Sequence, residues 1–479
     1  MSTLPQLADR VDAQFPQTVE VLKSLVAIPS YAAPSAPPDV LLRSAERVAD
    51  LLCGIGGQDV EIVQAGGGPG VIGQIWVSDA APTVLLYAHH DVQPVANDWS
   101  TDPWEPVIKG DRLYGRGAAD DGAGVALHVA ALRALGSDLG VNVRFFIEGE
   151  EESGSPTFGA LLRRYRDRLA ADVVVIADSD NASVDVPALT VSLRGVTDVT
   201  VTLRIAEHAV HSGSFGGVVL DAPTLLARLI ATLHDAAGSV CVEGLAPTGH
   251  TRASVSPESI RQGAGLVPGL VLAGEGSVAD RLWWSPAIDL IGFDSTGVDE
   301  SSNTIQPVAR ARLSLRVPPG MDPVVAQAAL ARHLAERVEF GASLVIEDGV
   351  SGAGFKADIS GPAYAVACRA LGDAFGQPVV FQGQGGSIPL AAELAAVFPG
   401  IEVLMTGVED PDSRAHSGDE SVSLPMLRKA VLGEALLLDY LRSYGAGLGA
   451  GGGAQVGAGL GAEDGAGAAG CEAPTGTGQ

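Results

Sequence analysis

The chain has 479 residues, of which 46% are hydrophobic, and its 57 Asp and Glu outnumber its 30 Lys and Arg, for a formal charge of -27. This length predicts two or three domains, and the apolar fraction is sufficient for sizeable cores. The negative charge argues against nucleic acid or an anionic membrane as the main partner, because both require a basic surface.

The predicted compartment follows from features that the sequence lacks. The N-terminal segment has no apolar core of signal-peptide length, and no stretch approaches the roughly 20 apolar residues that a membrane helix requires. The cysteines are scattered, with no CxxC pair, which argues against a disulfide framework or a zinc knuckle. They are Cys53, Cys241, Cys368 and Cys471. We therefore expect a cytoplasmic protein without a membrane span.

The first part of the chain alternates between predicted helices and predicted strands. Nearly continuous apolar runs at 83–88, 141–147 and 173–177 are typical of central strands covered on both faces. Helices are expected at 7–26, 40–52 and 121–135, with Gly136 closing the last of these, and a further strand at 71–77. This alternation predicts an α/β domain.

The order of predicted strands and helices changes near residue 193. Strands at 197–204, 309–317 and 343–347 and helices at 221–234 and 322–338 predict an α+β module inserted into the first domain. The α/β texture returns with a helix at 364–375, a strand at 401–405 and a helix at 424–444. The composition from 445 onward, almost entirely Gly and Ala, predicts a disordered tail. The predicted domains are therefore 1–192 with 353–444, then 193–352, then the tail 445–479.

Histidines and acids follow several of the predicted strands. They are His89-His90-Asp91 after the strand 83–88, Glu148 and Glu150 to Glu152 after 141–147, Asp178 and Asp180 after 173–177, and, beyond a loop, His416 after 401–405. Asp120 and Asp121 also stand immediately before a predicted helix. Functional groups in α/β sheets collect beyond the carboxyl ends of strands.

Each of these features also has a purely structural explanation. Asp120 and Asp121 could cap a helix, and Glu150 to Glu152 could form a solvated acidic loop. Their expected convergence at one sheet edge favours a bound cation, because close carboxylates repel one another unless cations or protons lie among them. A mixed histidine and carboxylate set suits Zn²⁺ or Mn²⁺. The residues therefore predict a metal site.

The ordered motifs add a family resemblance. The strings are HHDVQP, YGRGAADD, EGEEESGS, HSGSFGG, GGSIP and AHSGDE. In this order they resemble the di-zinc superfamily of carnosinase, cytosolic non-specific dipeptidase, glutamate carboxypeptidase, aminoacylase and succinyl-diaminopimelate desuccinylase, especially its dipeptidase and carnosinase branch. The resemblance extends to about residue 444. It implies an α/β catalytic domain with a mixed sheet and helices on both faces, and an inserted α+β lid and dimerisation domain.

The resemblance also implies a set of metal ligands. It assigns His89 and Asp178 to a first metal, Asp120 to a bridge between two metals, and Glu152 and His416 to the second metal. Asp91 would orient the His89 imidazole, and the Asp120–Asp121 bond is cis in relatives. The expected ions are two divalent metals, Zn²⁺ first, with Mn²⁺ or Co²⁺ as alternatives.

Some neighbouring residues compete for these roles. His90 adjoins His89, but neighbours in a strand point to opposite faces, so both cannot easily ligate. Asp180 competes with Asp178, which follows its strand directly and lies nine residues before Pro187 as in relatives. Glu148 and Glu150 are not expected to be ligands.

The implied mechanism is hydrolysis of an amide bond. A water bridging the two metals would have a lowered pKa, and Glu151 would take its proton as general base and pass it to the leaving amine. His211 matches a histidine that reaches the active site of the other subunit, which implies a homodimer. Arg316 would hold the substrate carboxylate by bidentate pairing, and Asn303, Gly386 and Ser387 would also contact the substrate.

One position departs from the family pattern. Relatives often have Arg-Glu before Gly-Gly-Ser, whereas this chain has Gly383-Gln384. Recognition of a free amino terminus by an acid at that position is therefore in doubt. The sequence predicts a metallo-dipeptidase acting on small peptides, with a deacylase of N-acyl amino acids as the alternative. A non-catalytic protein that inherited the fold is disfavoured because every ligand position and Glu151 are occupied as expected.

Overall fold

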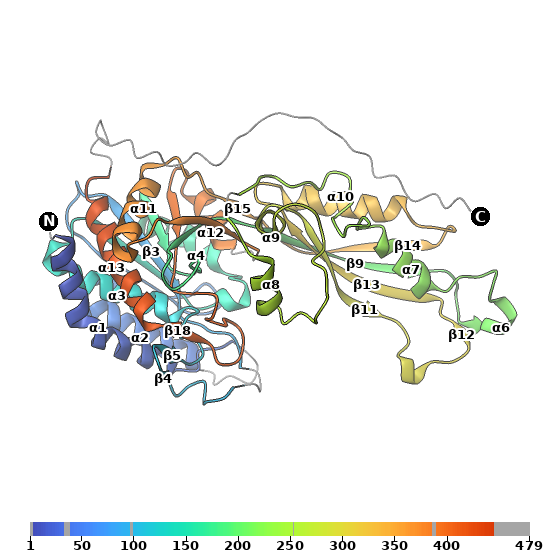
Figure 1. The fold of residues 1–479 in the computed structure, drawn as a ribbon, viewed down its shortest axis with the longest axis horizontal. Helices are drawn as coiled ribbons and strands as arrows, with labels where there is room; N and C mark the ends of the chain where they lie inside the picture. The colour runs from blue at the N-terminus through green and yellow to red at the C-terminus, as the bar shows by residue number, and fades with distance from the viewer. Residues whose placement is uncertain (1–2, 33–38, 96–98, 252, 386–388, 445–479) are drawn as a thin grey trace. The chain divides into compact units, whose positions relative to one another are not determined.

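The computed structural model describes residues 3–32, 39–95, 99–251, 253–385 and 389–444. Two compact units make up this part of the chain (Figure 1). The first unit contains the residues up to Val191, Ala357–Gln382 and the described residues from 389 onward. The second unit contains Ser192–Lys356 and residues 383–385. The predicted tail, 445–479, lies outside the described residues.

Most strands of a mixed nine-stranded sheet lie in the first unit. Its order is β1-β2-β6-β3-β7-β17-β8-β15, with β16 pairing to β8. The strands β6, β3, β7 and β17 run parallel to one another, so their carboxyl ends lie at one edge. The strand bounds are β1 (Gln58–Val63), β2 (Gly70–Ile75), β3 (Thr83–His89), β6 (Asn142–Glu148), β7 (Val173–Ile176), β8 (Ala188–Leu193), β15 (Phe355–Lys356), β16 (Val380–Gln384) and β17 (Glu402–Met405).

The central strands are covered on both faces. Leu85 and Leu86 point to opposite sides of β3, and both are fully buried, as the continuous apolar run predicts. Helix α3 (Gly122–Leu135) is buried along almost its whole length because it packs between α1 (Leu4–Val26), α13 (Leu424–Leu441) and β3 (Figure 1). The other helices of this unit are α2 (Val40–Gly54), α4 (Phe158–Arg164), α5 (Arg166–Leu169), α11 (Pro362–Phe375) and α12 (Pro389–Val397).

A small antiparallel sheet stands beside the large one in the same unit. It consists of β4 (Val107–Lys109), β5 (Arg112–Tyr114) and β18 (Ser421–Ser423), in the order β18-β5-β4. Pairing of β18 with β5 joins segments about 300 residues apart in sequence. The sequence did not predict these three-residue strands, although they position two loops of the site described below.

The second unit is an antiparallel sheet with helices. Its order is β11-β13-β9-β14, and α7 and α10 pack on it. Alternate residues of β9, namely Val199, Val201 and Leu203, enter its core. The bounds are β9 (Gly195–Arg204), β10 (Val210–His211), β11 (Ala287–Asp294), β12 (Thr304–Ile305), β13 (Val308–Val317), β14 (Ser343–Gly352), α6 (Ser212–Phe215), α7 (Ala222–Ala231), α8 (Pro257–Gly263), α9 (Val278–Trp283) and α10 (Pro323–Glu336).

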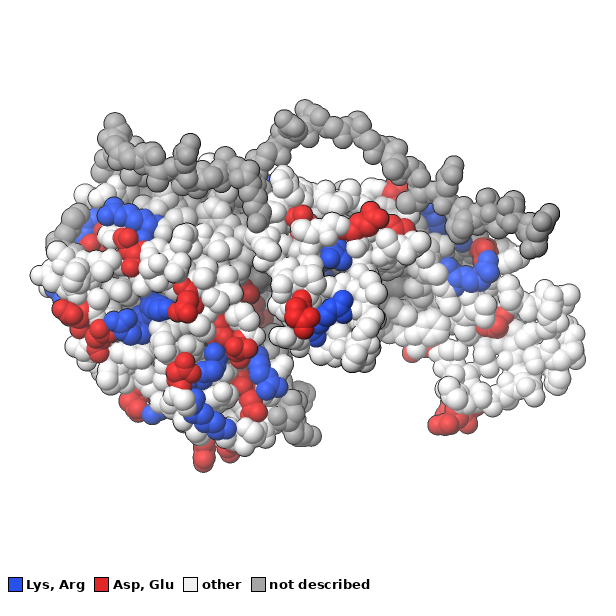
Figure 2. Space-filling view, in the orientation of Figure 1, with Lys and Arg blue, Asp and Glu red and all other residues white. Residues whose placement is uncertain are grey.

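The predicted elements are confirmed, with shifted ends. The helix predicted at 221–234 stops at Ala231, and the strand predicted at 343–347 continues to Gly352. Among the described residues, no helix is both long enough and apolar enough to span a membrane. On the face drawn in Figure 2, acidic and basic side chains are interspersed rather than gathered into one basic surface.

Candidate metal centre

His89, the last residue of β3, is held at the edge of the sheet by three contacts. Its backbone N–H donates to Asp121 Oδ2 at 3.0 Å, and its Nδ1 lies 3.0 Å from the Asp91 carbonyl oxygen. Its Nε2 lies 3.0 Å from Asp120 Oδ1. With Nδ1 donating to the carbonyl, Nε2 is left as the nitrogen that a metal would use.

The site residues form two clusters. We call His89, Glu151 and Asp178 the strand-end cluster, and Asp120, Glu152 and His416 the loop cluster. Within each cluster, one potential ligand atom of every residue lies within 4.8 Å of the others. All of the predicted metal ligands are therefore brought together in the first unit.

Asp120 lies between the two clusters. Its Oδ1 is 3.0 Å from His89 Nε2, and its Oδ2 is 2.8 Å from His416 Nε2. His416 Nε2 is also 3.2 Å from Glu152 Oε2, and His89 Nε2 is 3.8 Å from Asp178 Oδ1. One carboxylate with an oxygen toward each histidine has the arrangement that a bridging ligand requires.

Asp91 supports both a ligand and the acids beyond β6. Its carboxylate accepts hydrogen bonds from the backbone N–H of Glu151 at 3.1 Å and of Glu152 at 3.0 Å. Its Oδ1 is also 3.5 Å from His89 Nδ1. The short helix η2 (Glu151–Ser153) is thereby fixed against the end of β3. The sequence predicted only the contact with the imidazole.

The loop that carries Asp120 folds around a buried carboxylate. Glu420 Oε1 accepts hydrogen bonds from Ala119 N at 2.9 Å and Asp120 N at 3.1 Å, and Glu420 Oε2 accepts from Gly117 N at 3.1 Å. Arg116 Nη1 donates to Glu420 Oε2 at 2.7 Å. The Asp120–Asp121 peptide is cis. Glu420 immediately precedes β18, so one side chain positions the Asp120 loop from the opposite end of the sequence.

His416 belongs to the loop between β17 and β18. The buried Arg116 reaches this loop too, because its Nη2 donates to Ser417 O at 3.2 Å. The His416 side chain is 56% exposed, whereas the Asp120 side chain is 9% exposed and that of Glu152 is 5% exposed. The loop cluster thus has one solvent-facing member supported by two buried acids.

The pKa values of the cluster residues show that their negative charges are not balanced by the protein itself. Burial, and then the charge of Asp178, raises the pKa of Glu151 to about 9. Burial raises the pKa of Asp178 to about 7, with the Asp120 carboxylate adding to the effect. Hydrogen bonds to Asp120 and Glu152 raise the pKa of His416 to about 11. In the absence of metal, then, protons occupy a site that two divalent ions would neutralise.

A second observation tests whether these residues fit metal ions. Glu152 Oε1 is buried and has no hydrogen-bond partner, although Glu152 Oε2 contacts His416 and accepts a hydrogen bond from Gln93 Nε2 at 2.7 Å. A buried carboxylate oxygen without a partner is costly unless a cation occupies the space beside it. Two histidines with carboxylates form a donor set suited to Zn²⁺ or Mn²⁺. The residues present therefore fit the metals.

The competing residues have structural partners. His90 Nε2 donates to Pro69 O at 2.7 Å, on the other side of the strand from His89. Tyr87 Oη donates to Glu148 at 2.6 Å, and Gly68 N donates to Glu150 at 2.8 Å. Gln382 Nε2 donates to Asp180 Oδ1 at 2.8 Å. None of these four residues belongs to either cluster.

One acid at the site was missed by the sequence reasoning. Glu409 follows β17, and its carboxylate lies within 4.8 Å of the carboxylates of Asp120 and Asp178. Burial, and then the charge of Asp120, raises its pKa well above the usual range. The signal was available, because β17 is parallel to β7 and Glu409 stands four residues after Met405. That strand end was interpreted only for His416.

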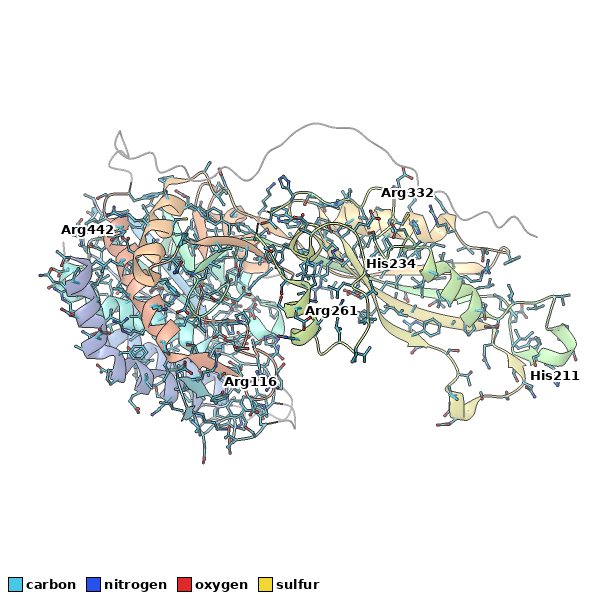
Figure 3. The ribbon with its side chains drawn as sticks, viewed as in Figure 1. Arg116, His211, His234, Arg261, Arg332 and Arg442 are labelled. Carbon is cyan, nitrogen blue, oxygen red and sulfur yellow. The ribbon has the colours of Figure 1, made fainter. Side chains whose placement is uncertain are left out.

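Three further predicted residues, His211, Asn303 and Arg316, belong to the second unit. His211 is exposed beside α6 (Figure 3), and its Nδ1 accepts a hydrogen bond from Gly213 N at 3.0 Å. Asn303 precedes Thr304, the residue that pairs with His211 across the β10–β12 ladder, and the Asn303 carbonyl accepts a hydrogen bond from Ser212 N at 3.0 Å. Gly386 and Ser387 lie outside the described residues. The roles of all five toward substrate stay predictions.

Arg316 has a cationic neighbour that the sequence did not single out. Arg194 is mostly buried, and its pKa is lowered to about 10 by burial and then by the nearby charge of Arg316. Arg316 lies in β13 and pairs with Val196 of β9, two residues from Arg194. Guanidinium groups suit the binding of a carboxylate, and Asp289 already acts on Arg194 by raising its pKa.

Comparisons with known proteins agree with the geometry. The family described as Peptidase family M20/M25/M40 matches residues 85–440. The cysteinylglycine-S-conjugate dipeptidase of Corynebacterium striatum is 35% identical over 378 residues, which cover 76% of this chain and 82% of that protein. The beta-Ala-His dipeptidase of Rattus norvegicus is 28% identical, over 88% of this chain and 92% of that protein. Human carnosine dipeptidase 1 has a similar crystal structure, with a TM-score of 0.74, 25% identity and coverage of 92% of this chain and 99% of that one.

Proposed function

The chain belongs to peptidase family M20/M25/M40 and is a hydrolase of that family, and from this premise we propose that it is a two-metal dipeptidase. The observation that carries the proposal is the position of Asp120, with one oxygen toward His89 and the other toward His416. A carboxylate placed in this way can be shared by two ions held by the two histidines. Dipeptidase is also the activity in the names of both relatives described above.

Two divalent ions would be held by the predicted ligands, with Zn²⁺ as the expected metal and Mn²⁺ or Co²⁺ as alternatives. His89 and Asp178 would hold one ion, Glu152 and His416 the other, and Asp120 both. When bound, such a pair polarises the scissile carbonyl and makes water a stronger acid. Glu151 belongs to the strand-end cluster but is not needed as a ligand, so its carboxylate is available to move a proton.

Glu151 would act as the general base. Its carboxylate takes a proton from the attacking water and gives it to the nitrogen of the leaving amine, so that one group serves both halves of the reaction. Asp91 holds the Glu151 backbone N–H at 3.1 Å and so fixes the acid at the edge of the sheet. The reaction is completed when the protonated amine and the new carboxylate separate.

The second unit would supply the groups that recognise the C-terminal part of the substrate. Arg316, next to Arg194, would bind the substrate carboxylate, and Asn303 would contact the substrate beside it. His211 would stabilise the developing oxyanion of a partner subunit, which makes a homodimer through the second unit part of the proposal. Its exposure beside α6 is compatible with such a contact.

The proposal includes a cytoplasmic location. The free thiols of Cys53 and Cys368 are compatible with it, because disulfides are rare in that compartment.

The proposal is tested by a substrate panel on the purified full chain. The protein is stripped with chelator, reloaded with Zn²⁺, Mn²⁺ or Co²⁺, and assayed on unblocked dipeptides and on N-acetyl amino acids. Hydrolysis of dipeptides that disappears with chelator and returns with metal is the expected result. Hydrolysis of N-acetyl amino acids alone would instead support the deacylase, which the neutral Gln384 keeps as the second candidate. No hydrolysis with any metal would overturn both.

A further inference from the structure

Glu409 occupies a strand end equivalent to those of the proposed ligands. The parallel strands β6, β3, β7 and β17 are neighbours, and the first three lead to Glu151, His89 and Asp178. The fourth, β17, leads to Glu409, which therefore reaches the same edge. Its carboxylate lies within 4.8 Å of those of Asp120 and Asp178.

The backbone of Glu409 is fixed against the segment that follows β7. Glu409 N donates to Ser179 O at 3.4 Å, and the Glu409 carbonyl accepts a hydrogen bond from Asn181 N at 2.8 Å. Glu409 also forms an isolated parallel bridge with Asp180. The position of the side chain at the sheet edge is thus set by the β7–β17 pairing and not by a freely moving loop.

The carboxylate of Glu409 differs from those of its acidic neighbours. Asp91 accepts two backbone amides, Asp180 accepts Gln382, and Glu420 accepts three backbone amides and Arg116. In the part of the chain that the structure describes, the Glu409 carboxylate accepts no hydrogen bond and forms no ion pair, and the charges that act on it most strongly are those of other acids. The residue is only partly buried, so a ligand can reach it.

Charge balance separates Glu409 from the proposed metal ligands. Two divalent ions bring four positive charges, which the carboxylates of Asp120, Glu151, Glu152 and Asp178 already balance, and Asp91 beside His89 adds a further carboxylate. Glu409 is then a negative charge in excess at the edge of the metal pair. A dipeptide brings one positive charge to such a site, because its free α-amino group is largely protonated near neutral pH.

We propose that Glu409 binds the free α-amino group of the substrate and thereby makes the enzyme selective for unblocked dipeptides. This assignment rests on the proposed dipeptidase function. An ammonium group bound by Glu409 would position the scissile bond at the metal site, because only the α-carbon separates the amino group of a dipeptide from the carbonyl carbon that is attacked. Glu409 is then a specificity residue, and an N-acylated substrate leaves its charge unpaired.

The test compares a dipeptide with its blocked form, which share the scissile bond. The zinc-loaded full chain is assayed on Ala-Gly and on N-acetyl-Ala-Gly. Glu409→Gln should lower kcat/KM for Ala-Gly by at least about 30-fold, as expected for truncating one partner of a close charge pair, and change that for N-acetyl-Ala-Gly by less than about twofold. Asp180→Asn is the matched control, because it removes an adjacent carboxylate that already has a side-chain partner. It should affect both substrates equally.

Two further readouts do not depend on turnover. Glycine hydroxamate should bind the Glu409→Gln protein more weakly in calorimetry, with the N-acetylated hydroxamate unaffected. The metal content per chain should stay at the wild-type value. Loss of one ion would overturn the assignment by making Glu409 a ligand, and an equal fall for both substrates would overturn it by making Glu409 merely structural. Failure of the wild-type chain to cleave any dipeptide would instead refute the proposed function.

Discussion

The strand-end cluster and the loop cluster are built in different ways. His89 ends β3 and Asp178 follows β7, two buried parallel strands of the large sheet whose hydrogen-bond ladder sets the positions of both residues. Asp120 and His416 lie in loops that flank the small β4–β5–β18 sheet, and Glu420 with Arg116 holds those loops together. One half of the site is therefore positioned by backbone pairing and the other by a buried ion pair. Side-chain substitutions should consequently disturb the two halves unequally.

The largest expected effect separates chemistry from metal binding within the strand-end cluster. Glu151→Gln should lower kcat by about 10³–10⁴-fold, because it removes the proton acceptor while keeping the shape of the side chain. Both metals should remain bound, as measured by plasma emission spectroscopy on the purified protein. Wild-type turnover in this variant would refute the assigned base, and loss of one ion would show that Glu151 is a ligand.

The next effect should be confined to the loop cluster. Glu420→Gln weakens the hydrogen bonds that the Glu420 carboxylate accepts from the backbone N–H groups of Ala119 and Asp120. The affinity for one of the two ions should therefore fall by about 10–100-fold, as expected when a group that orients a metal ligand is changed. The other ion should keep its affinity. Metal-buffered titrations monitored by calorimetry give both constants.

Glu150→Gln is the matched control for this comparison. Glu150 is also a buried acid that accepts backbone amides, from Gly68 and Thr157, but it supports the loops near β6. Its substitution should leave both metal affinities within about threefold of wild type, since the Glu150 carboxylate belongs to neither cluster and accepts backbone amides outside both. Equal losses in the two variants would remove the distinction between the clusters.

A smaller effect, on stability, concerns the support of β3. His128 of α3 donates to the Tyr87 carbonyl and faces Glu434 of α13, with Nδ1 to Oε1 at 2.8 Å. Burial opposes the charged imidazole, but the charge of Glu434 and its hydrogen bond outweigh burial and raise the pKa of His128 above 6.5. The stabilisation is therefore full below pH 6.5 and is lost as pH rises through the folded-state pKa.

The corresponding experiment uses Glu434→Gln in metal-free protein. Its deficit in unfolding free energy relative to wild type should be on the order of 1–3 kcal/mol at acidic pH, as for a buried charged hydrogen bond, and should shrink as pH increases. Urea unfolding between pH 5.5 and pH 9 measures the difference. A deficit that grows with pH would show that the pair is not ionic.

The smallest effect on turnover should come from outside both clusters. Arg316→Lys retains the charge but loses the planar pair of donors, so KM for a dipeptide should rise by about tenfold with little change in kcat. Metal content should not change. A fall in kcat with KM preserved would mean that Arg316 acts on the reacting atoms and not on the substrate carboxylate.

The two clusters also differ in how far sequence could predict them. Continuous apolar runs locate β3, β6 and β7, and alternation along a strand separates His89 from His90, so the strand-end acids can be placed by pattern. The strand ends and a helix start already placed Asp120, Glu152 and His416 among the candidates, but only the motif resemblance assigned them as ligands. β5 and β18 are three residues long, too short to carry a periodic signal. The hydrogen bonds between Glu420 and the Asp120 loop depend on the pairing of β18 with β5, which lie far apart in the sequence.

Some functional detail was present in the sequence but was not extracted. The motif AHSGDE was interpreted for His416, although the last residue of that string is Glu420. Asp91 was assigned to the imidazole alone, whereas it also accepts the backbone amides of Glu151 and Glu152. Contacts of this kind depend on main-chain N–H directions, which a residue pattern does not encode.

The central claim is that two ions are shared through Asp120, and the most direct test counts them. Wild-type protein reloaded with Zn²⁺ should contain about two ions per chain, as expected for a two-metal hydrolytic site, and dipeptide hydrolysis should follow the binding of the weaker one. Asp120→Asn should lose both high-affinity ions, whereas His416→Ala should lose only one. A wild-type content of one ion, or an Asp120→Asn protein that keeps two, would contradict the account.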